Sequence, residues 1–201
     1  MKNNNYFYAF VLLYWVLMSI DLQNILNILE QGGVILYPTD TVWGIGCDAT
    51  NVEAIARVNA IKNRQQGQPL IVLVDSIEML QNFVEEIPVF VLEKLKTFQN
   101  PTTIIYPNAK NFHGMLLGNN RSIGIRIVNH PFTTAMITQF GKPVVSTSAN
   151  FSGQLTPKRF DEILPEIISQ MDFVVSGYHD VENTKPSDIY KITDRVLERI
   201  R

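Results

Sequence analysis

The segment that follows a short apolar run near residue 35 combines residue types that could bind a small polar ligand. The run is Val34-Ile35-Leu36, and it is followed by Tyr37-Pro38-Thr39-Asp40-Thr41-Val42-Trp43-Gly44-Ile45-Gly46-Cys47-Asp48. We expect a buried strand that stops at the proline and then a loop. Two threonine hydroxyls, two glycines and exposed backbone amides are poor material for a core, but they suit a polar ligand at the end of a sheet strand.

Two basic residues close the next helical pattern. Lys62 and Arg64 belong to the segment Ile61-Lys62-Asn63-Arg64, at the end of the helical pattern Val52–Lys62. Because residues two positions apart do not share one face of a helix, at least one of them should project from the following loop toward a cavity. They would either bind an anionic ligand there or form a solvated pair that complements the helix dipole.

Further along, an arginine and three polar residues occur in strand-like patterns. Arg126 lies in the alternating run Ile123–Val128, on the face opposite the isoleucines. An arginine in such a place is often a surface residue packed along its stem. Ser146, Ser148 and Asn150 alternate after the next apolar strand start, so they would share one side of a continued strand. Their hydroxyl and amide groups could bind a nucleotide, or they could form a turn that caps its own backbone.

In this order, the Tyr37–Asp48 segment, the Lys62-x-Arg64 pair and the Ser148-x-Asn150 pair resemble the YrdC-like family, the threonylcarbamoyl-AMP synthases. The resemblance spans roughly residues 32–201. It implies an enzyme that makes L-threonylcarbamoyladenylate from L-threonine, bicarbonate and ATP and releases pyrophosphate. The product would serve the threonylcarbamoyladenosine modification of tRNA. The resemblance also implies an open α/β sheet with a large concave cavity.

The resemblance assigns roles to particular residues of this chain. Lys62 and Arg64 would be catalytic, neutralising the triphosphate and the carbamoyl carboxylate. The residues that would bind ATP are Lys62, Arg64, Thr103, Ser148, Asn150 and Arg201. Those that would bind threonine are Thr39, Arg126, Ser146 and Ser187, with Arg126 as a forked clamp on the carboxylate. Arg199 is the alternative to Arg201 at the nucleotide, although spacing from Ser187 favours Arg201.

The sequence contains no evident covalent nucleophile and no evident metal-ligand set. His113, His130 and His179 are scattered without metal-ligand spacing, so we expect no zinc site. Chemistry by positioning of reactive substrates is therefore favoured over a covalent enzyme intermediate. A magnesium ion should accompany ATP, held mainly through the phosphates, and Asp40 or Asp48 could help to hold it.

Short apolar runs that alternate with helical patterns predict one α/β domain, with helices packed on a twisted, open, mixed sheet. The expected strands are Val34–Leu36, Leu70–Val74, Thr102–Tyr106, Ile123–Val128, Val144–Thr147, Phe173–Val175 and Ile189–Ile192. The expected helices are Asp21–Gln31, Val52–Lys62, Ile77–Phe83, Val89–Phe98, Phe132–Phe140 and Phe160–Ser169.

Composition limits the class of protein. The 201 residues are 46% hydrophobic and include one cysteine, Cys47, which is typical of a reducing compartment and more consistent with packing than with catalysis. Residues 1–17 form an apolar extension that is short for a membrane span, because a span needs about 20 apolar residues. The plainer explanation is that translation begins at Met18, so that the domain covers 18–201; a membrane-associated or packed extension is the alternative. We expect a cytoplasmic protein without membrane binding.

Two other functions compete with synthesis of the adenylate. The same cavity could admit tRNA or double-stranded RNA without turnover, but a net charge of −2 argues against a general basic surface. We therefore expect no stable binding of nucleic acid, and we expect the product to pass to a tRNA threonylcarbamoyltransferase complex. The other competitor is a carbamoyl-transfer domain detached from a larger maturation enzyme, which the single cysteine makes a weak alternative.

Overall fold

The computed structural model describes residues 21–64, 70–180, 182 and 185–201. The strands are β1 (Ile35–Tyr37), β2 (Gly44–Gly46), β3 (Ile71–Val74), β4 (Thr102–Tyr106), β5 (Ile123–Ile127), β6 (Val144–Ser148), β7 (Phe173–Val174), β8 (Asp188–Thr193) and β9 (Val196–Arg199). The helices are residues 21–30, α2 (Val52–Ile61), α3 (Ile77–Gln81), α4 (Val89–Leu95), α5 (Pro131–Phe140) and α6 (Pro165–Ile168). Short 3-10 turns are η1 (Gly114–Leu116), η2 (Asn119–Arg121) and η3 (Phe160–Glu162).

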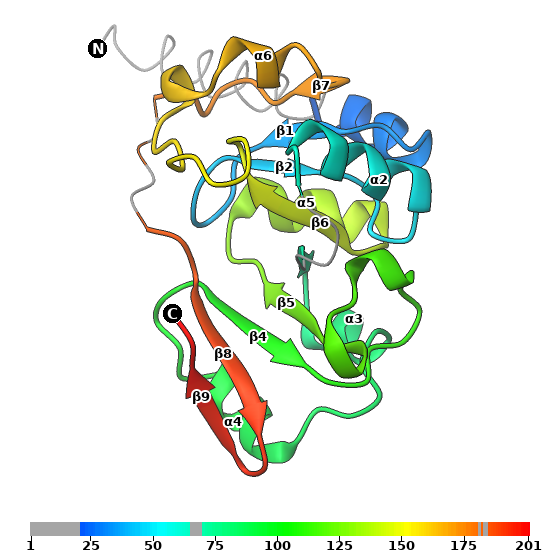
Figure 1. Cartoon of the computed structure of the whole chain (residues 1–201), viewed down its shortest axis with the longest axis vertical. Coiled ribbons are helices and arrows are strands. Elements are labelled where there is room, and N and C mark those ends of the chain that lie inside the picture. Colours follow the sequence, from blue (N-terminus) through cyan, green and yellow to red (C-terminus); the bar gives the residue numbers. More distant parts are fainter. Residues whose placement is uncertain (1–20, 65–69, 181, 183–184) are drawn as a thin grey trace, which may run out of the picture.

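Within the described residues the strands form one nine-stranded sheet in the order β7-β1-β2-β6-β3-β5-β4-β8-β9. The pairs β1–β7, β3–β5 and β4–β8 are parallel, and the remaining neighbours are antiparallel. The sheet is open, with β7 at one edge and the β8–β9 hairpin at the other (Figure 1). The predicted twisted, open, mixed sheet is confirmed.

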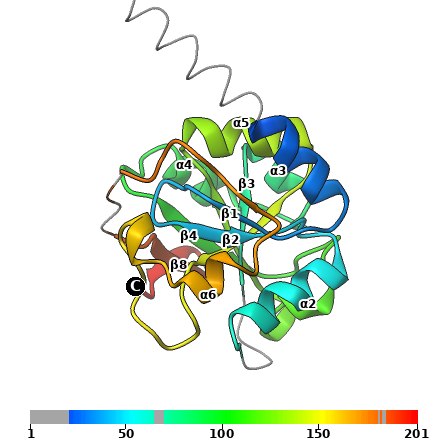
Figure 2. The same ribbon diagram turned by 90° about the horizontal axis from the view of Figure 1, so that it is seen from above.

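Helices cover both faces of this sheet. Seen from above, residues 21–30, α3, α4 and α5 lie on one side of the strands, and α2 and α6 lie on the other (Figure 2). Two of these helices begin at residues whose side chains cap them. The Asn51 side chain accepts from the Ala54 amide and so caps α2. His130 caps α5 through the Thr133 amide, with Pro131 at the first helical position, as expected of a strand-to-helix turn.

The segment after β1 differs from the loop predicted for it. Gly44–Gly46 forms β2, which pairs with β1 and β6, and most residues from Leu36 to Ala49 are buried. The expectation that these residues would make poor core material was therefore wrong. The glycines are what allow the burial: a Cβ at Gly46 would lie 2.6 Å from Cε1 of the Tyr37 ring. Because Gly44 and Gly46 have no side chain, β2 can pack closely against Tyr37, which precedes the turn.

Two further differences lie in the second half of the chain. The helix predicted over Phe160–Ser169 is the turn η3 followed by the short helix α6, because Pro165 disfavours helical backbone at the residue before it. β9 was missed because it lies at an exposed edge, where only Leu197 is partly buried and no apolar alternation marks the strand. The predicted run Ile189–Ile192 lies within β8, which extends one residue further at each end.

The hydrophobic core lies between the sheet and its helices. Its largest fully buried side chains are Trp43, Tyr37 and Tyr106. Cys47 is also buried, and burial raises the pKa of its thiol, which agrees with a packing role. No helix among the described residues is long and apolar enough to cross a bilayer. The predictions for residues 1–17 and for a start at Met18 fall outside the described part of the chain.

Candidate functional site

A pocket of about 380 Å³ lies beside the centre of the sheet. Its walls include residues from β2, β3, β4, β5 and β6, together with residues near the end of the chain. Seven of the ten residues predicted to bind ATP or threonine line it: Arg64, Thr103, Arg126, Ser146, Ser148, Ser187 and Arg201. Two of these seven, Arg64 and Arg201, are 137 positions apart in the sequence and line the same pocket. Thr39, Lys62 and Asn150 do not line it.

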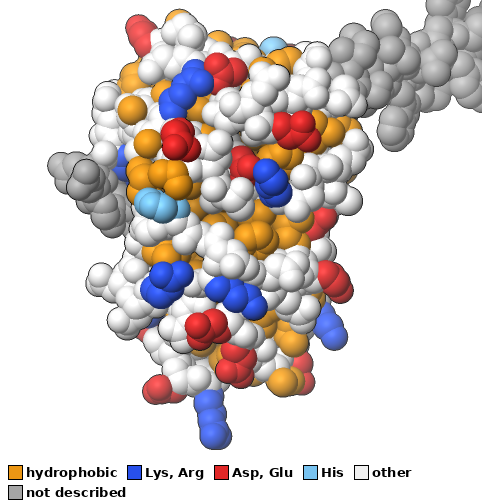
Figure 3. Space-filling model, turned by 90° about the vertical axis from the view of Figure 1, so that its right-hand side faces the viewer, with side chains coloured by type: hydrophobic (Ala, Val, Ile, Leu, Met, Phe, Trp, Pro, Cys, Tyr) orange, Lys and Arg blue, Asp and Glu red, His pale blue; other side chains and the backbone are white. Residues whose placement is uncertain are grey.

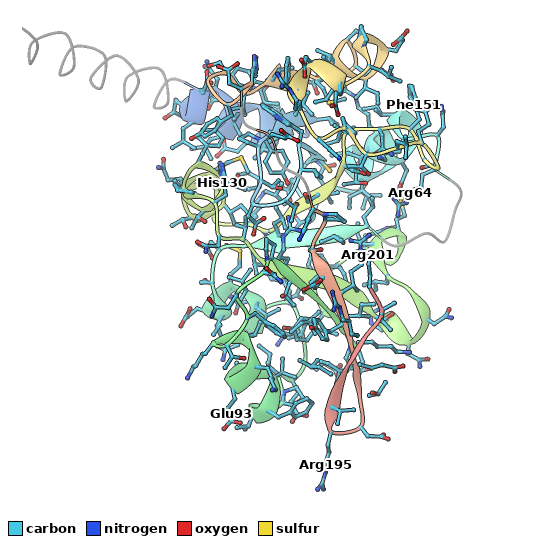
Figure 4. The ribbon with its side chains drawn as sticks, turned by 90° about the vertical axis from the view of Figure 1, so that its left-hand side faces the viewer. Arg64, Glu93, His130, Phe151, Arg195 and Arg201 are labelled. Carbon is cyan, nitrogen blue, oxygen red and sulfur yellow. The ribbon has the colours of Figure 1, made fainter. Side chains whose placement is uncertain are left out.

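The pocket wall is positively charged. Arg64, Arg126 and Arg201 line it, and none of its described lining residues is an aspartate or glutamate. Figure 4 shows Arg201 in the middle of the molecule and Arg64 above it toward the right-hand side, whereas Arg195 lies at the tip of the β8–β9 hairpin. Burial lowers the pKa of both Arg64 and Arg126, which shows that their charges are partly withdrawn from water. Such cations bind anionic groups more strongly than exposed ones do.

Arg64 lies just beyond the end of α2, as the spacing of the basic pair predicted for one of its members. Its Nη1 is 3.5 Å from the Thr147 hydroxyl on β6. Asn63, between α2 and Arg64, has a φ of 48°, so the chain turns sharply where the helix ends. This turn directs Arg64 toward the pocket and separates it from Lys62.

Lys62 points away from the pocket volume, into the loop after β6. Its ammonium group donates to the carbonyl oxygens of Ser148 and Asn150 and, over 3.2 Å, to the Asn150 side-chain oxygen. The side chain is 2% exposed. In this arrangement Lys62 holds the end of β6 and the loop that follows it, and its predicted contact with the triphosphate stays a prediction.

The environment of Lys62 predicts how stability depends on pH. Burial, followed by the positive charge of Arg64, lowers the pKa of Lys62 from 10.5 to about 7. Above pH 7 the unfolded chain then binds more protons at this residue than the folded chain, so the free energy of unfolding should rise with pH. The raised pKa values of Cys47 and Tyr37 have the opposite effect once their unfolded forms begin to ionise, near pH 9.

We therefore expect the free energy of unfolding to rise between pH 7 and pH 8.5, and we expect Lys62→Met to remove most of that rise. Urea denaturation of both proteins at the two pH values measures the effect. Lys142→Met is the matched control, because Lys142 also pairs with a buried oxygen but its own side chain is 47% exposed. A rise of equal size in wild type and in Lys62→Met would contradict the assignment.

Asn150 and Ser148 have different positions although they are two residues apart. Ser148 ends β6 and lines the pocket. The Asn150 side chain is 8% exposed; it accepts from Lys62 and donates to the carbonyls of Phe151 and Gln154. β6 ends at Ser148 and the loop turns, so Asn150 does not share the strand face that a continued strand would have given it. A contact between Asn150 and ATP stays a prediction.

Thr39 and Thr41 form a hydroxyl pair at the pocket wall. The Thr39 hydroxyl donates to the Val42 carbonyl, accepts from the Thr41 amide and lies 2.9 Å from the Thr41 hydroxyl. Thr41, and not Thr39, lines the pocket. The Thr39 hydroxyl thus organises the turn that presents Thr41, and direct binding of threonine by Thr39 stays a prediction.

The lower wall of the pocket is tied together by residues from β4 and from the end of the chain. Thr103 and Ser187 are both buried, and their hydroxyl oxygens lie 2.8 Å apart. The Arg201 guanidinium donates to the Ser187 carbonyl through Nε and Nη2, at 3.3 and 3.2 Å. Arg199 instead pairs with Asp188 at 2.6 Å and does not line the pocket. Of the two candidate arginines, Arg201 is the one beside the site.

Several polar residues in the wall were missed from the sequence. They are Thr41, Ser122, Thr147 and Thr156. Thr41 belongs to the segment singled out for its two hydroxyls, so the pairing with Thr39 was available as a signal. Thr147 was missed because strict alternation along β6 places it opposite Ser146 and Ser148, whereas all three line the pocket at the end of the strand. No local pattern marks Ser122 or Thr156.

The two aspartates proposed to help hold magnesium are engaged elsewhere. Asp40 Oδ1 lies 3.1 Å from Arg126 Nη2, and Asp40 Oδ2 accepts from the Asn129 amide. Asp48 pairs with Lys142 at 2.9 Å and accepts from the Thr50 amide and hydroxyl. No group of three or more His, Cys, Asp or Glu side chains within the described ranges could hold a metal ion. A role for either aspartate beside magnesium has no support in this geometry.

Comparison with known proteins identifies the family. Residues 27–201 match the model of the Sua5/YciO/YrdC family, described as "Telomere recombination". The chain belongs to this family. It is 38% identical, over 168 residues, to a protein of Pseudoalteromonas translucida named threonylcarbamoyl-AMP synthase, covering 80% of this chain and 87% of the relative. A protein of the same name from Photobacterium profundum is 32% identical over 160 residues, covering 78% of this chain and 86% of the relative.

Solved Sua5/YciO/YrdC structures share the fold. E. coli YciO superposes with a TM-score of 0.79 at 24% identity, covering 92% of this chain and 89% of YciO. P. abyssi Sua5 complexed with L-threonine superposes with a TM-score of 0.80 at 23% identity. The superposition covers 90% of this chain and 53% of that Sua5 chain. The family resemblance read from the Tyr37–Asp48, Lys62-x-Arg64 and Ser148-x-Asn150 motifs is thus confirmed.

Proposed function

We propose that this chain is a threonylcarbamoyl-AMP synthase. The amino group of L-threonine combines with bicarbonate to give a carbamate and water. A carbamate oxygen then attacks the α-phosphorus of ATP, the bond to the β-phosphate oxygen breaks, and pyrophosphate leaves. The product, L-threonylcarbamoyladenylate, is the activated donor for threonylcarbamoyladenosine in tRNA. The names of the family relatives support this activity.

The observation that carries the proposal is the composition of the pocket wall. Three arginines and several hydroxyls from distant segments line one hollow that contains no acidic lining residue among those described. The reaction must bring a triphosphate and two further anions into one place, and fixed cations offset their mutual repulsion. Hydroxyl groups on β4 and β6 can donate to phosphate, ribose or amino-acid oxygens without adding charge.

The wall has two regions that suit the two larger substrates. Arg64, just beyond α2, and Ser148, at the end of β6, line one part of the wall, and we assign them, together with Arg201, to the phosphates of ATP. Arg126, with Thr41 and Ser146 near it in the wall, is assigned to the threonine carboxylate. Catalysis then comes from alignment and charge stabilisation, with no covalent enzyme intermediate.

Magnesium enters this scheme with the nucleotide. Among the described residues the pocket wall offers no carboxylate, so the ion would be held through the phosphates and water, as is usual for Mg²⁺. When bound there it would add positive charge beside the leaving pyrophosphate. Bicarbonate, as a small anion, would use the same arginine-lined wall.

We place the activity in the cytoplasm, where its product would pass to a tRNA threonylcarbamoyltransferase complex. The surface favours a hand-over of the small molecule over a stable complex of this chain with tRNA. On the face shown in Figure 3, Lys and Arg side chains are interspersed with Asp and Glu and form no continuous basic stripe. Nucleic-acid binding that does not depend on sequence would need such a stripe.

The test is incubation of the full chain with ATP, ¹³C-bicarbonate and each of several amino acids, followed by mass spectrometry. We expect threonine to give a carbamoyl-adenylate that carries one ¹³C atom, together with an equal amount of pyrophosphate. Serine, valine and alanine should give much less. RNA binding that depends on salt, without formation of any adenylate, would favour the RNA-binding alternative instead.

A further inference from the structure

A buried carboxylate pairs with the arginine assigned to the amino acid. Asp40 and Arg126 form an ion pair in which their side chains are 7% and 4% exposed. The pair joins the turn after β1 to β5, two segments far apart in the sequence. A buried ion pair is costly to form, because both charges lose contact with water and good geometry is needed to offset that loss.

Asp40 does not line the pocket that would hold the substrates, whereas Arg126 does line it. Asp40 instead lines a smaller neighbouring pocket of about 240 Å³, which among the described residues shares only Thr41 and Pro186 with the first. A ligand in the larger pocket would therefore contact Arg126 and would not contact Asp40.

Arg126 and Asp40 contact each other as an ion pair and not through a hydrogen bond. In the described part of the chain, Asp40 is the one ion-pair partner of the Arg126 side chain, while Asp40 Oδ1 and Arg126 Nε have no hydrogen-bond partner. Asp40 is itself held at its other oxygen by the Asn129 amide, 3.2 Å away. The chain of contacts runs from the backbone after β5, through the carboxylate, to Nη2 of the guanidinium.

We propose that Asp40 is a positioning residue for the amino-acid substrate: it holds Arg126 by one end of the guanidinium and so presents the rest to the substrate carboxylate. This inference rests on the proposed function only for the identity of the ligand. A guanidinium fixed in advance loses less conformational entropy when it binds a carboxylate, so a fixed Arg126 binds threonine more tightly than a mobile one. Asp40 does not touch the reacting atoms.

The test compares Asp40→Ala and Asp40→Asn with wild type in steady-state kinetics. In Asp40→Ala we expect the KM for threonine to rise at least about tenfold, while the KM for ATP stays within about twofold. Asp40→Asn should show a smaller rise, because it keeps the shape and one acceptor oxygen. Asp40→Asn also provides the test if Asp40→Ala does not fold, since the alanine variant leaves the buried charge of Arg126 unpaired and such a charge is strongly destabilising.

The matched control is Asp48→Asn. Asp48 lies on the same segment, its side chain is 5% exposed, and it also forms an ion pair, but its partner Lys142 is 47% exposed and does not line the pocket as Arg126 does. We expect Asp48→Asn to lower the melting temperature and to leave the KM for threonine unchanged. An equal rise in both variants would show that loss of stability alone accounts for the effect and would overturn the proposal.

A second measurement needs no catalysis. In ¹⁵N-arginine-labelled protein, the guanidinium resonances of Arg126, assigned by comparison with Arg126→Lys, should show slow rotation in wild type and fast rotation in Asp40→Ala. Slow rotation that persists in Asp40→Ala would overturn the proposal, as would an unchanged or lower KM for threonine. If wild type makes no threonine adenylate, the proposed function fails, and the rotation of Arg126 alone decides whether Asp40 positions it.

Discussion

Replacement of Arg64 by alanine should reduce the rate of pyrophosphate release by at least about a hundredfold, because a half-buried cation beside the transferring phosphate stabilises charge that water cannot replace. Arg64 lines the pocket and lies 3.5 Å from the Thr147 hydroxyl at the end of β6. The fold should remain intact, since the side chain projects from the turn after α2 and is not part of the core. Release of pyrophosphate with saturating threonine and bicarbonate measures the effect.

Arg57→Ala is the control for this variant. Arg57 lies on α2 itself, and its guanidinium pairs with Asp172 and the Gln170 carbonyl at the surface, away from the pocket. An ion pair as exposed as this one contributes little to stability, so we expect Arg57→Ala to retain activity. Near-normal turnover in Arg64→Ala would remove Arg64 from the phosphate site.

Replacement of Arg126 by lysine should raise the KM for threonine by roughly 10- to 100-fold while the KM for ATP changes little. Lysine keeps the positive charge beside Asp40, so the buried ion pair is retained and the protein should fold. It cannot offer the two parallel N–H groups with which an arginine binds a carboxylate. Initial rates with each substrate varied in turn measure this separation.

Arg121→Lys provides the comparison for the change from arginine to lysine. Arg121 lies shortly before β5, and its Nε and Nη2 both donate to the Ala109 carbonyl, but it does not line the pocket. We expect this variant to keep the KM of wild type for both substrates. If Arg126→Lys also leaves the KM for threonine unchanged, the carboxylate is bound by other residues.

The sequence predicted strands and helices well where periodicity and composition agree. β4 occupies the predicted residues, and α2 and α5 differ from prediction by one residue at one end. β2 was missed because Gly44-Ile45-Gly46 contains no strand-forming side chains beyond a single isoleucine, and its pairing depends on the close approach of Tyr37. Long-range packing of this kind leaves no local signature.

The sequence motifs point to residues that the structure brings to one pocket, because these motifs concentrate charged and hydroxyl residues. What the motifs do not contain is the direction of each side chain. Lys62 turns to the carbonyls of the loop after β6, and Arg64 turns to the pocket, although both belong to one short motif. Asp40 was considered only as a magnesium ligand, since its partner Arg126 lies 86 positions away and nothing in the sequence joins them. Such pairings are set by the register of β5 beside β3 and β4.

A crystal structure of this chain with L-threonine and a non-hydrolysable ATP analogue is the most direct measurement of where the two substrates lie. We predict both ligands in the pocket between Arg64, Arg126 and Arg201, with the threonine carboxylate on Arg126 and the amino group directed toward the α-phosphate. The gap between that nitrogen and the α-phosphorus should fit the one carboxyl group that bicarbonate adds to the nitrogen. Threonine and nucleotide on separate surfaces, or a nucleotide whose phosphates lie away from Arg64, would contradict a shared site.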